Sequence, residues 1–407
     1  MEEVLVNIEN TTFRLTLGLF GIVLIYFLLI ISAHLITQLI HKLKFREKPL
    51  IYDYIYRYIL DEITLDDIHY RRYQEEVLIQ GFTDIISSIT GEREQKLKQA
   101  FINLGLISSV EKGLYSMFSS SRTRCCYTLG VIGSPASVPY LRSMLYDPNP
   151  GVVFSAIMAL GEIRDNSCLG SLVSYFSKCS PGAAWLIAAI LPFFGGPSYR
   201  HIEPYLKPGQ LPSYKQMLLT RVAASLKLPE STEQLQSLYY KSMDIDLRLS
   251  CLKAIGKIND LACVKTIIEA LSDAQWQIRA VACNLVGEMS IKGAVYRLLP
   301  LLEDSNWFVR KNSAAALVRL GDIGIAALLA ALETNDRYAR DMVVQTLEEN
   351  AVVENAVEKL SSTNPREYEK ALELIKTLIK KGYTEYLNNF MRTSPEIRGL
   401  ITSREKS

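Results

Sequence analysis

Apolar residues recur along most of the chain with a period of about 31 residues, the spacing expected of a repeated structural unit. The segment Asp304–Ile323 (DSNWFVRKNSAAALVRLGDI) matches Asp273–Ser290 (DAQWQIRAVACNLVGEMS) position by position. One position, an arginine in both segments, serves as a reference for each copy. The reference positions are Arg122, Val153, Ala184, Gln216, Arg248, Arg279, Arg310 and Arg340. The sequence therefore predicts about eight copies of one unit.

Three columns of this frame predict the first helix of each unit. Seven positions after the references, an unbroken apolar column reads Leu129, Leu160, Leu191, Ala223, Ile255, Val286, Leu317 and Leu347. Four positions after, the column is mostly apolar and reads Cys126, Ile157, Ala188, Thr220, Leu252, Cys283, Ala314 and Val344. Eight positions after, small residues dominate until the C-terminal copies. Spacings of three and four place these columns on one helical face.

A second helix is predicted in most units, with glycine and polar residues between the two helices. The second helices are predicted at Ala136–Leu145, Cys168–Phe176, Ala262–Leu271, Gly293–Leu302 and Gly324–Leu332. One such helix pair cannot bury its own apolar face, whereas stacked pairs can. The sequence therefore predicts an all-α fold, an α-α superhelix, over residues 91–395, with a polar C-terminal tail at 396–407.

This pattern, an aspartate, then Val/Ile-Arg, an alanine-rich stretch and Leu-Gly, resembles the HEAT repeats. The short period is similar to the subgroup named after phycobilisome lyases. The resemblance implies a ladder of aspartate and arginine side chains that links neighbouring repeats. Its predicted members are Asp273 with Arg279, Asp304 with Arg310, Asp244 or Asp246 with Arg248, and Asp336 with Arg340; Asp147 faces Val153 rather than an arginine.

The N-terminal region predicts a membrane location. Residues 15–33 (LTLGLFGIVLIYFLLIISA) carry no charge and are long enough to span a bilayer as a helix. Acidic residues precede this stretch, and Lys42, Lys44, Arg46 and Lys48 follow it. By the positive-inside rule, we expect an exoplasmic N-terminus at 1–13, a single transmembrane helix at 14–40 and a cytoplasmic solenoid. The lipid bilayer would contact residues 14–40.

The juxtamembrane segment at 41–90 is rich in tyrosine. These side chains either lie at the lipid headgroups or belong to a helical cap on the first repeat. Farther along, residues 182–197 carry no charge and either form a buried helix or a docking surface. The proline-interrupted segment Tyr199–Lys215 is either an inserted partner-binding loop or a divergent repeat.

Aromatic residues are the candidates for partner binding. Trp276 and Trp307 occupy the same column, three positions before the reference arginines, where they form either a binding strip or inter-repeat packing. The other candidates, in the uncharged segment, are Trp185, Phe193 and Phe194.

Composition argues against several function classes. Lys and Arg total 45 against 43 for Asp and Glu, which does not favour nucleic acid as a partner. The seven cysteines include no CxxC pair, and we expect no metal site, no cofactor and no catalytic cluster. Cys126 lies in an apolar column, so we expect it to pack in the core.

These features favour a membrane-anchored scaffold or accessory subunit that binds proteins, possible clients being a membrane enzyme or export complex. Two alternatives remain open. The first is an enzyme similar to bilin lyases, which use the same kind of repeat. The second is a sensor of lipid surfaces that acts through the tyrosine-rich segment.

Overall fold

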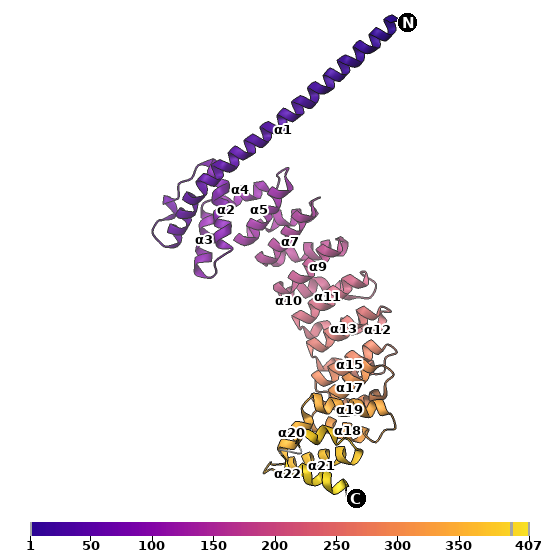
Figure 1. Ribbon diagram of the computed structural model, residues 1–407. Helices are drawn as coiled ribbons and strands as arrows, with labels where there is room; N and C mark the ends of the chain where they lie inside the picture. Colours follow the sequence, from indigo (N-terminus) through magenta and orange to yellow (C-terminus); the bar gives the residue numbers. More distant parts are fainter. Residues whose placement is uncertain (1, 391–393, 406–407) are drawn as a thin grey trace. The chain divides into compact units, whose positions relative to one another are not determined.

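The computed structural model describes residues 2–390 and 394–405, within which every regular element is a helix (Figure 1). The side chains of residues 2–17, 33, 36–47, 388–389 and 403–405 lie outside the description. The chain forms two compact units, Met1–Cys168 and Leu169–Ser407.

Unit 1 begins with one long helix, which is followed by short helices that pack in pairs. Its α-helices are α1 (Glu2–Ile59), α2 (Glu75–Ile86), α3 (Glu92–Asn103), α4 (Leu106–Gly113), α5 (Ser119–Ile132), α6 (Val138–Ser143) and α7 (Pro150–Ile163). Its 3₁₀ helices are η1 (Leu65–Asp67), η2 (Arg72–Gln74), η3 (Pro135–Ser137), η4 (Met144–Tyr146) and η5 (Asn166–Cys168).

Unit 2 continues the alternation of first and second helices. Its α-helices are α8 (Leu169–Lys178), α9 (Pro181–Ile190), α10 (Gly196–Ile202), α11 (Ser213–Leu226), α12 (Thr232–Lys241), α13 (Ile245–Ile258), α14 (Val264–Ala270), α15 (Trp276–Glu288), α16 (Val295–Leu298), α17 (Trp307–Arg319), α18 (Asp322–Ala331), α19 (Arg337–Glu349), α20 (Val352–Lys359), α21 (Pro365–Lys381) and α22 (Pro395–Glu405). Its 3₁₀ helices are η6 (Leu191–Phe194), η7 (Glu203–Leu206), η8 (Pro229–Ser231), η9 (Leu261–Cys263), η10 (Lys292–Ala294), η11 (Leu299–Glu303) and η12 (Glu385–Phe390).

Capping side chains set where the first helix of several repeats begins. The Asn149 side chain accepts from the Gly151 N–H, and the Asn306 side chain accepts from the Phe308 N–H. Asp244, Asp336 and Asn364 occupy the equivalent position of other repeats and cap in the same way. These bonds satisfy backbone donors that an α-helix leaves unpaired in its first turn. In these repeats the capping residue therefore helps to fix where the first helix begins.

The predicted apolar columns form the core. Every member of the column seven positions after the references is fully buried, and so are nearly all members of the column four positions after. Along each unit, successive first helices pack on one another, as α5 does on α7 and α15 does on α17 (Figure 1). The second helices are present at the predicted segments. The all-α solenoid is thus confirmed.

Small residues after the apolar column allow these first helices to approach closely. A Cβ atom on Gly130 would lie 2.7 Å from the Cα of Ala159, on the neighbouring helix. A Cβ atom on Gly287 would lie 3.0 Å from the Cα of Ala316. Because the obstacle is backbone in both cases, a larger residue would push the helices apart.

The predicted transmembrane segment falls within α1. The helix predicted at 14–40 is part of one continuous helix that includes Pro49 and ends at Ile59. In the part of the chain whose side chains are described, no helix is both long enough and apolar enough to cross a membrane. The structure therefore does not support the transmembrane prediction, part of which, including 14–17 and 36–40, falls outside the described side chains.

The C-terminal part of α1 packs on the first repeat. Ile51 and Ile55 are fully buried, and the Tyr52 hydroxyl donates to the Asp84 carboxylate of α2 at 2.5 Å. Burial, together with the hydrogen bond from this hydroxyl to Asp84, raises the pKa of Tyr52. This arrangement agrees with the helical cap, one of the two interpretations of the tyrosine-rich segment.

The proline-interrupted segment of unit 2 is a divergent repeat rather than a loop. Residues 196–202 form α10, which packs against α8 and α11, and η7 follows directly. Tyr199 and Ile202 are buried. Pro204 stands at the start of η7, where the missing N–H costs nothing, and Pro212 directly precedes α11.

Candidate functional site

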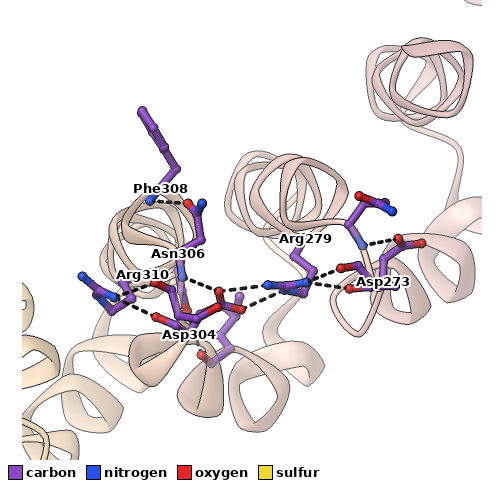
Figure 2. Close-up of polar contacts among 11 residues, drawn as sticks. Asp273, Arg279, Asp304, Asn306, Phe308 and Arg310 are labelled. Atoms are coloured by element: carbon purple, nitrogen blue, oxygen red, sulfur yellow. Dashed lines mark hydrogen bonds and ion pairs between the residues drawn. The ribbon is translucent and has the colours of Figure 1, made fainter. Parts of the chain in front are cut away.

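The reference arginines link consecutive repeats through what we call rungs. In the rung of Arg279, Nε and Nη2 donate to the two carboxylate oxygens of Asp304, at 2.8 and 2.9 Å (Figure 2). Nη1 donates to the backbone carbonyl of Asp273, six residues earlier, at 2.8 Å. One guanidinium thus joins the turn that precedes its own helix to the turn that precedes the next.

Two further rungs are closed by a carboxylate. Arg248 pairs with Asp273, and in unit 1 Arg122 pairs with Asp147 through bonds of 2.7 and 2.9 Å. The prediction that each aspartate pairs with the arginine six residues later is wrong. The arginine partner of each aspartate lies 25 residues upstream, in the preceding repeat. The guanidinium of Arg279 reaches the aspartate of the next repeat and meets only backbone carbonyls in its own. Asp147 accordingly has Arg122 as its partner.

Two of the rung carboxylates, those of Asp147 and Asp304, have a lowered pKa. The hydrogen bond from Arg122 is the main cause that lowers the pKa of Asp147. Burial alone would raise the pKa of Asp304, but the hydrogen bonds from Arg279 and from the Asn306 N–H outweigh burial and lower it. In each closed rung the aspartate also accepts from the N–H two residues on; for Asp304 and Asn306 the distance is 2.8 Å (Figure 2).

The C-terminal rungs lack the carboxylate, and we call them open. Arg310 repeats the carbonyl bond, with Nη1 donating to Asp304 at 2.8 Å, but its Nε is buried without a hydrogen-bond partner. The position equivalent to Asp304 is Thr334, whose hydroxyl accepts from the Asp336 N–H at 3.3 Å. Arg340 likewise donates to the Thr334 carbonyl at 2.7 Å. Neither arginine forms an ion pair within the described residues.

Two predicted ladder aspartates have another role. Asp244 accepts from the N–H groups of Asp246 and Leu247, and Asp336 accepts from those of Tyr338 and Ala339. Both are helix caps. Their position, four residues before the reference, points the carboxylate at the helix start rather than at a neighbouring arginine.

The copy whose reference is Ala184 has no arginine, and a lysine from the next repeat takes its place. The buried Lys215 ammonium donates to the carbonyls of Phe176, Ser177 and Cys179 at 2.8, 3.0 and 3.0 Å. Cys179 stands five residues before Ala184, and Arg279 bonds the carbonyl at this same offset. Sequence reasoning missed Lys215, although its place beside the reference Gln216 was a usable signal.

Aromatic side chains gather at the starts of α15 and α17, and we call Trp276, Trp307 and Phe308 the aromatic strip. Trp276 stacks on Phe308 of the next repeat with ring centroids 5.7 Å apart, and Trp307 meets Phe308 edge-on at 5.1 Å. Trp276, Trp307 and Phe308 remain 37%, 43% and 54% exposed. The tryptophans therefore pack between repeats and still present a surface. Phe308 was not predicted, although the repeat places it next to Trp307.

The other aromatic candidates differ in their exposure to solvent. Phe194 is buried in the core of unit 2, so its prediction as a partner-binding residue is not supported. Trp185 and Phe193 are exposed, whereas most of the alanines and isoleucines around them are buried, namely Ala183, Ala184, Ile187, Ala188 and Ile190. The uncharged segment is thus mainly core, with two aromatic rings at its surface.

Thiol chemistry finds little support in the geometry. Cys126 is fully buried, as expected of a core residue, and burial raises its pKa to about 12. Such a thiol stays protonated and is a poor nucleophile. Among the described residues, no group of histidine, cysteine and acidic side chains is arranged to hold a metal ion.

Comparison with protein families identifies the repeats. Residues 107–189 and 264–348 match HEAT repeats, and residues 247–273 match the PBS lyase HEAT-like repeat. The chain therefore contains HEAT repeats in both units. No curated protein matches it.

Several solved structures are similar in fold. A chain from the structure of Kap95p with RanGDP has a TM-score of 0.47 at 11% identity, over 86% of this chain and 54% of that one. Kap121p bound to the C-terminus of Cdc14p gives 0.47 at 13% identity, over 82% and 45%. The CpcE–CpcF complex of phycocyanin lyase from Nostoc sp. PCC7120 gives 0.31 at 13%, over 59% and 94%. This chain thus spans about half the length of the first two.

Proposed function

We propose that the protein is a scaffold whose HEAT solenoid binds a protein partner through the aromatic strip. The observation that carries the proposal is the row of half-exposed rings on consecutive repeats, at the starts of α15 and α17. Large rings that stay partly exposed are the usual centres of binding energy in protein interfaces. A binding role rather than a catalytic one is proposed.

The rings are also held in place, which favours binding. The stacking of Trp276 on Phe308 and the edge contact of Trp307 fix three rings relative to one another. Lys311 lies over the Trp307 ring at 5.2 Å and adds a cation–π contact. A surface already ordered in the free protein loses little conformational entropy when a partner binds.

Site-specific photocrosslinking in the native host tests this proposal. A photoreactive amino acid at position 308 of the full chain should form a discrete protein adduct. The matched control carries the same amino acid at Tyr296, an exposed ring on the second helix α16.

The proposal requires that the adduct form at 308 and not at 296, and that Trp307→Ala abolish it. Equal crosslinking at both positions would show an unselective surface. Absence of any adduct at position 308, in cells that express the full chain, would count against the strip as a binding site.

The membrane location also remains a proposal. It is supported by the uncharged residues 15–33, the basic residues that follow, and the exposure of apolar α1 side chains from Leu19 to Ile31. The solenoid would then face the cytoplasm. After cell lysis, extraction with alkaline carbonate should leave the full chain in the membrane pellet. Release into the supernatant would reject the anchor without affecting the scaffold proposal.

A further inference from the structure

We infer that the open rungs of Arg310 and Arg340 are binding sites for the carboxylates of an extended acidic segment in the partner. The inference rests on the proposed scaffold function and names the chemistry of what the scaffold binds. In the closed rungs the protein supplies the carboxylate itself. At Arg310 and Arg340 the same guanidinium geometry is present without it.

The free edge of Arg310 is the one that binds a carboxylate in the closed rungs. Arg279 uses Nη1 for the upstream carbonyl and the Nε–Nη2 edge for Asp304. Arg310 uses Nη1 in the same way (Figure 2). Its Nε–Nη2 edge therefore does not bind a carboxylate, and Nε is buried without a hydrogen-bond partner. A buried donor without a partner is costly, and a charge-assisted bond to a carboxylate would relieve that cost.

The chain cannot supply this carboxylate from the equivalent position. Thr334 accepts from the N–H two residues on, as Asp304 does, which establishes that the two positions correspond. The Thr334 hydroxyl donates to Glu303, which forms no ion pair with Arg310. For Arg340, the corresponding position is Ser362, whose hydroxyl accepts from the Asn364 N–H at 3.2 Å.

The surroundings of the open rungs indicate what else the partner segment carries. Tyr338 is 71% exposed, and its ring lies 5.8 Å from the Arg310 guanidinium. Such an exposed ring can turn aside without disturbing the core. Two rings of the aromatic strip, Trp307 and Phe308, belong to the first turn of α17, which also carries Arg310. An apolar side chain next to the acidic residue would pack on these rings.

The repeat also sets the spacing of the acidic residues. Packed helices lie roughly 8–10 Å apart, and an extended chain advances about 3.3 Å per residue. Carboxylates for consecutive rungs would therefore be about three residues apart in an extended segment. The partner chemistry is thus two acidic residues at this spacing with an aromatic or aliphatic residue between or beside them.

A library of short random peptides displayed on phage, selected on the full chain, tests the inference. Two variants remove the open rung in different ways. Arg310→Gln removes the guanidinium. Glu303→Ser with Thr334→Asp copies Ser272 and Asp304 of the neighbouring closed rung, and so fills the Arg310 edge from within. The matched controls are Glu303→Ser alone and Arg124→Gln, which lies in unit 1.

The expected result is enrichment of peptides with the acidic spacing above. Both rung variants should weaken binding of these peptides by about 30-fold, whereas the controls should not. The inference would be overturned if the enriched peptides lacked acidic residues, or if they bound the rung variants as tightly as the native chain. The scaffold proposal would survive that result if Phe308→Ala still weakened binding of the peptides. No enrichment, or binding insensitive to both Phe308 and Arg310, would overturn both.

Discussion

Two neighbouring rungs of unit 2 differ in one essential residue. Arg279 meets Asp304, whereas Arg310 meets Thr334, although both guanidinium groups bond the same upstream carbonyl position. The closed rung joins two repeats through a half-buried ion pair with a fixed bidentate geometry. The open rung keeps the carbonyl bond and leaves the charge without a partner. A repeat array can thus use one arginine column for stability in some copies and for recognition in others.

A third arrangement in the same unit supports this comparison. Where the reference is Ala184, Lys215 donates to carbonyls of the preceding turn, among them that of Cys179, whose offset matches a carbonyl that Arg279 bonds. The turn of this divergent repeat is therefore held without a rung. The missing arginine at Ala184 is thus compensated, whereas no other carboxylate among the described residues pairs with Arg310 or Arg340 in place of the one missing at Thr334 and Ser362. This asymmetry is what makes the open rungs candidates for function.

The largest expected effect is loss of a closed rung. Arg279→Gln should lower the free energy of unfolding of unit 2 by about 3 kcal/mol, because Asp304 would remain buried without its cation. The matched change Arg310→Gln should cost about 1 kcal/mol, since only carbonyl bonds are lost. Urea denaturation and hydrogen exchange of α15 and α17 measure both. Equal costs would remove the distinction between closed and open rungs.

The next effect concerns the substitute lysine. Lys215→Met should lower the free energy of unfolding by about 2 kcal/mol, because three carbonyls of the α8 turn lose their donor while the apolar stem is kept. Faster amide exchange should be confined to α8, α9 and α11. The exposed Lys265→Met is the control and should change stability by less than about 0.5 kcal/mol. A similar result for both lysines would show that Lys215 replaces nothing.

A smaller effect, in the opposite direction, follows from closing an open rung. Glu303→Ser with Thr334→Asp should raise the free energy of unfolding by about 1 kcal/mol, because a bidentate pair replaces an unpaired charge. Glu303→Ser alone should leave stability nearly unchanged. If the double variant is no more stable than this control, position 334 does not face Arg310 as position 304 faces Arg279. A crystal structure of the double variant would show the pair directly.

Much of the fold follows from the sequence because it depends on periodicity. Leu160, Ile255 and Leu317 lie in one column, and all three are fully buried as predicted. Side-chain pairing was harder to predict, because a column gives the offset along the chain but not which neighbour a side chain reaches. Arg122 and Asp147 were therefore left unpaired. The role of Lys215 becomes clear from the bond of its ammonium to the Cys179 carbonyl, and that of Thr334 from its equivalence in space to Asp304. The one-residue shifts of the frame hide both relations in the sequence.

The smallest effect is a pH dependence that separates the closed rung from its broken form. In the native protein the pKa of Asp304 is lowered, so the rung stabilises the fold above the unfolded pKa of about 4 and loses this contribution as the pH falls through the folded value. In Arg279→Gln the hydrogen bond from arginine is gone, and burial, which raises the pKa, is less opposed. In this variant, protonation of Asp304 removes an unpaired buried charge, whereas in the native protein it weakens the pair with Arg279. The stability difference between the native protein and Arg279→Gln should therefore narrow as the pH is lowered from about 5 to about 3, as followed by urea denaturation at each pH. The stability difference between the native protein and Arg310→Gln should hardly change with pH, because Arg310 has no carboxylate partner among the described residues. If this difference also narrowed at low pH, Arg310 would have a carboxylate partner in solution.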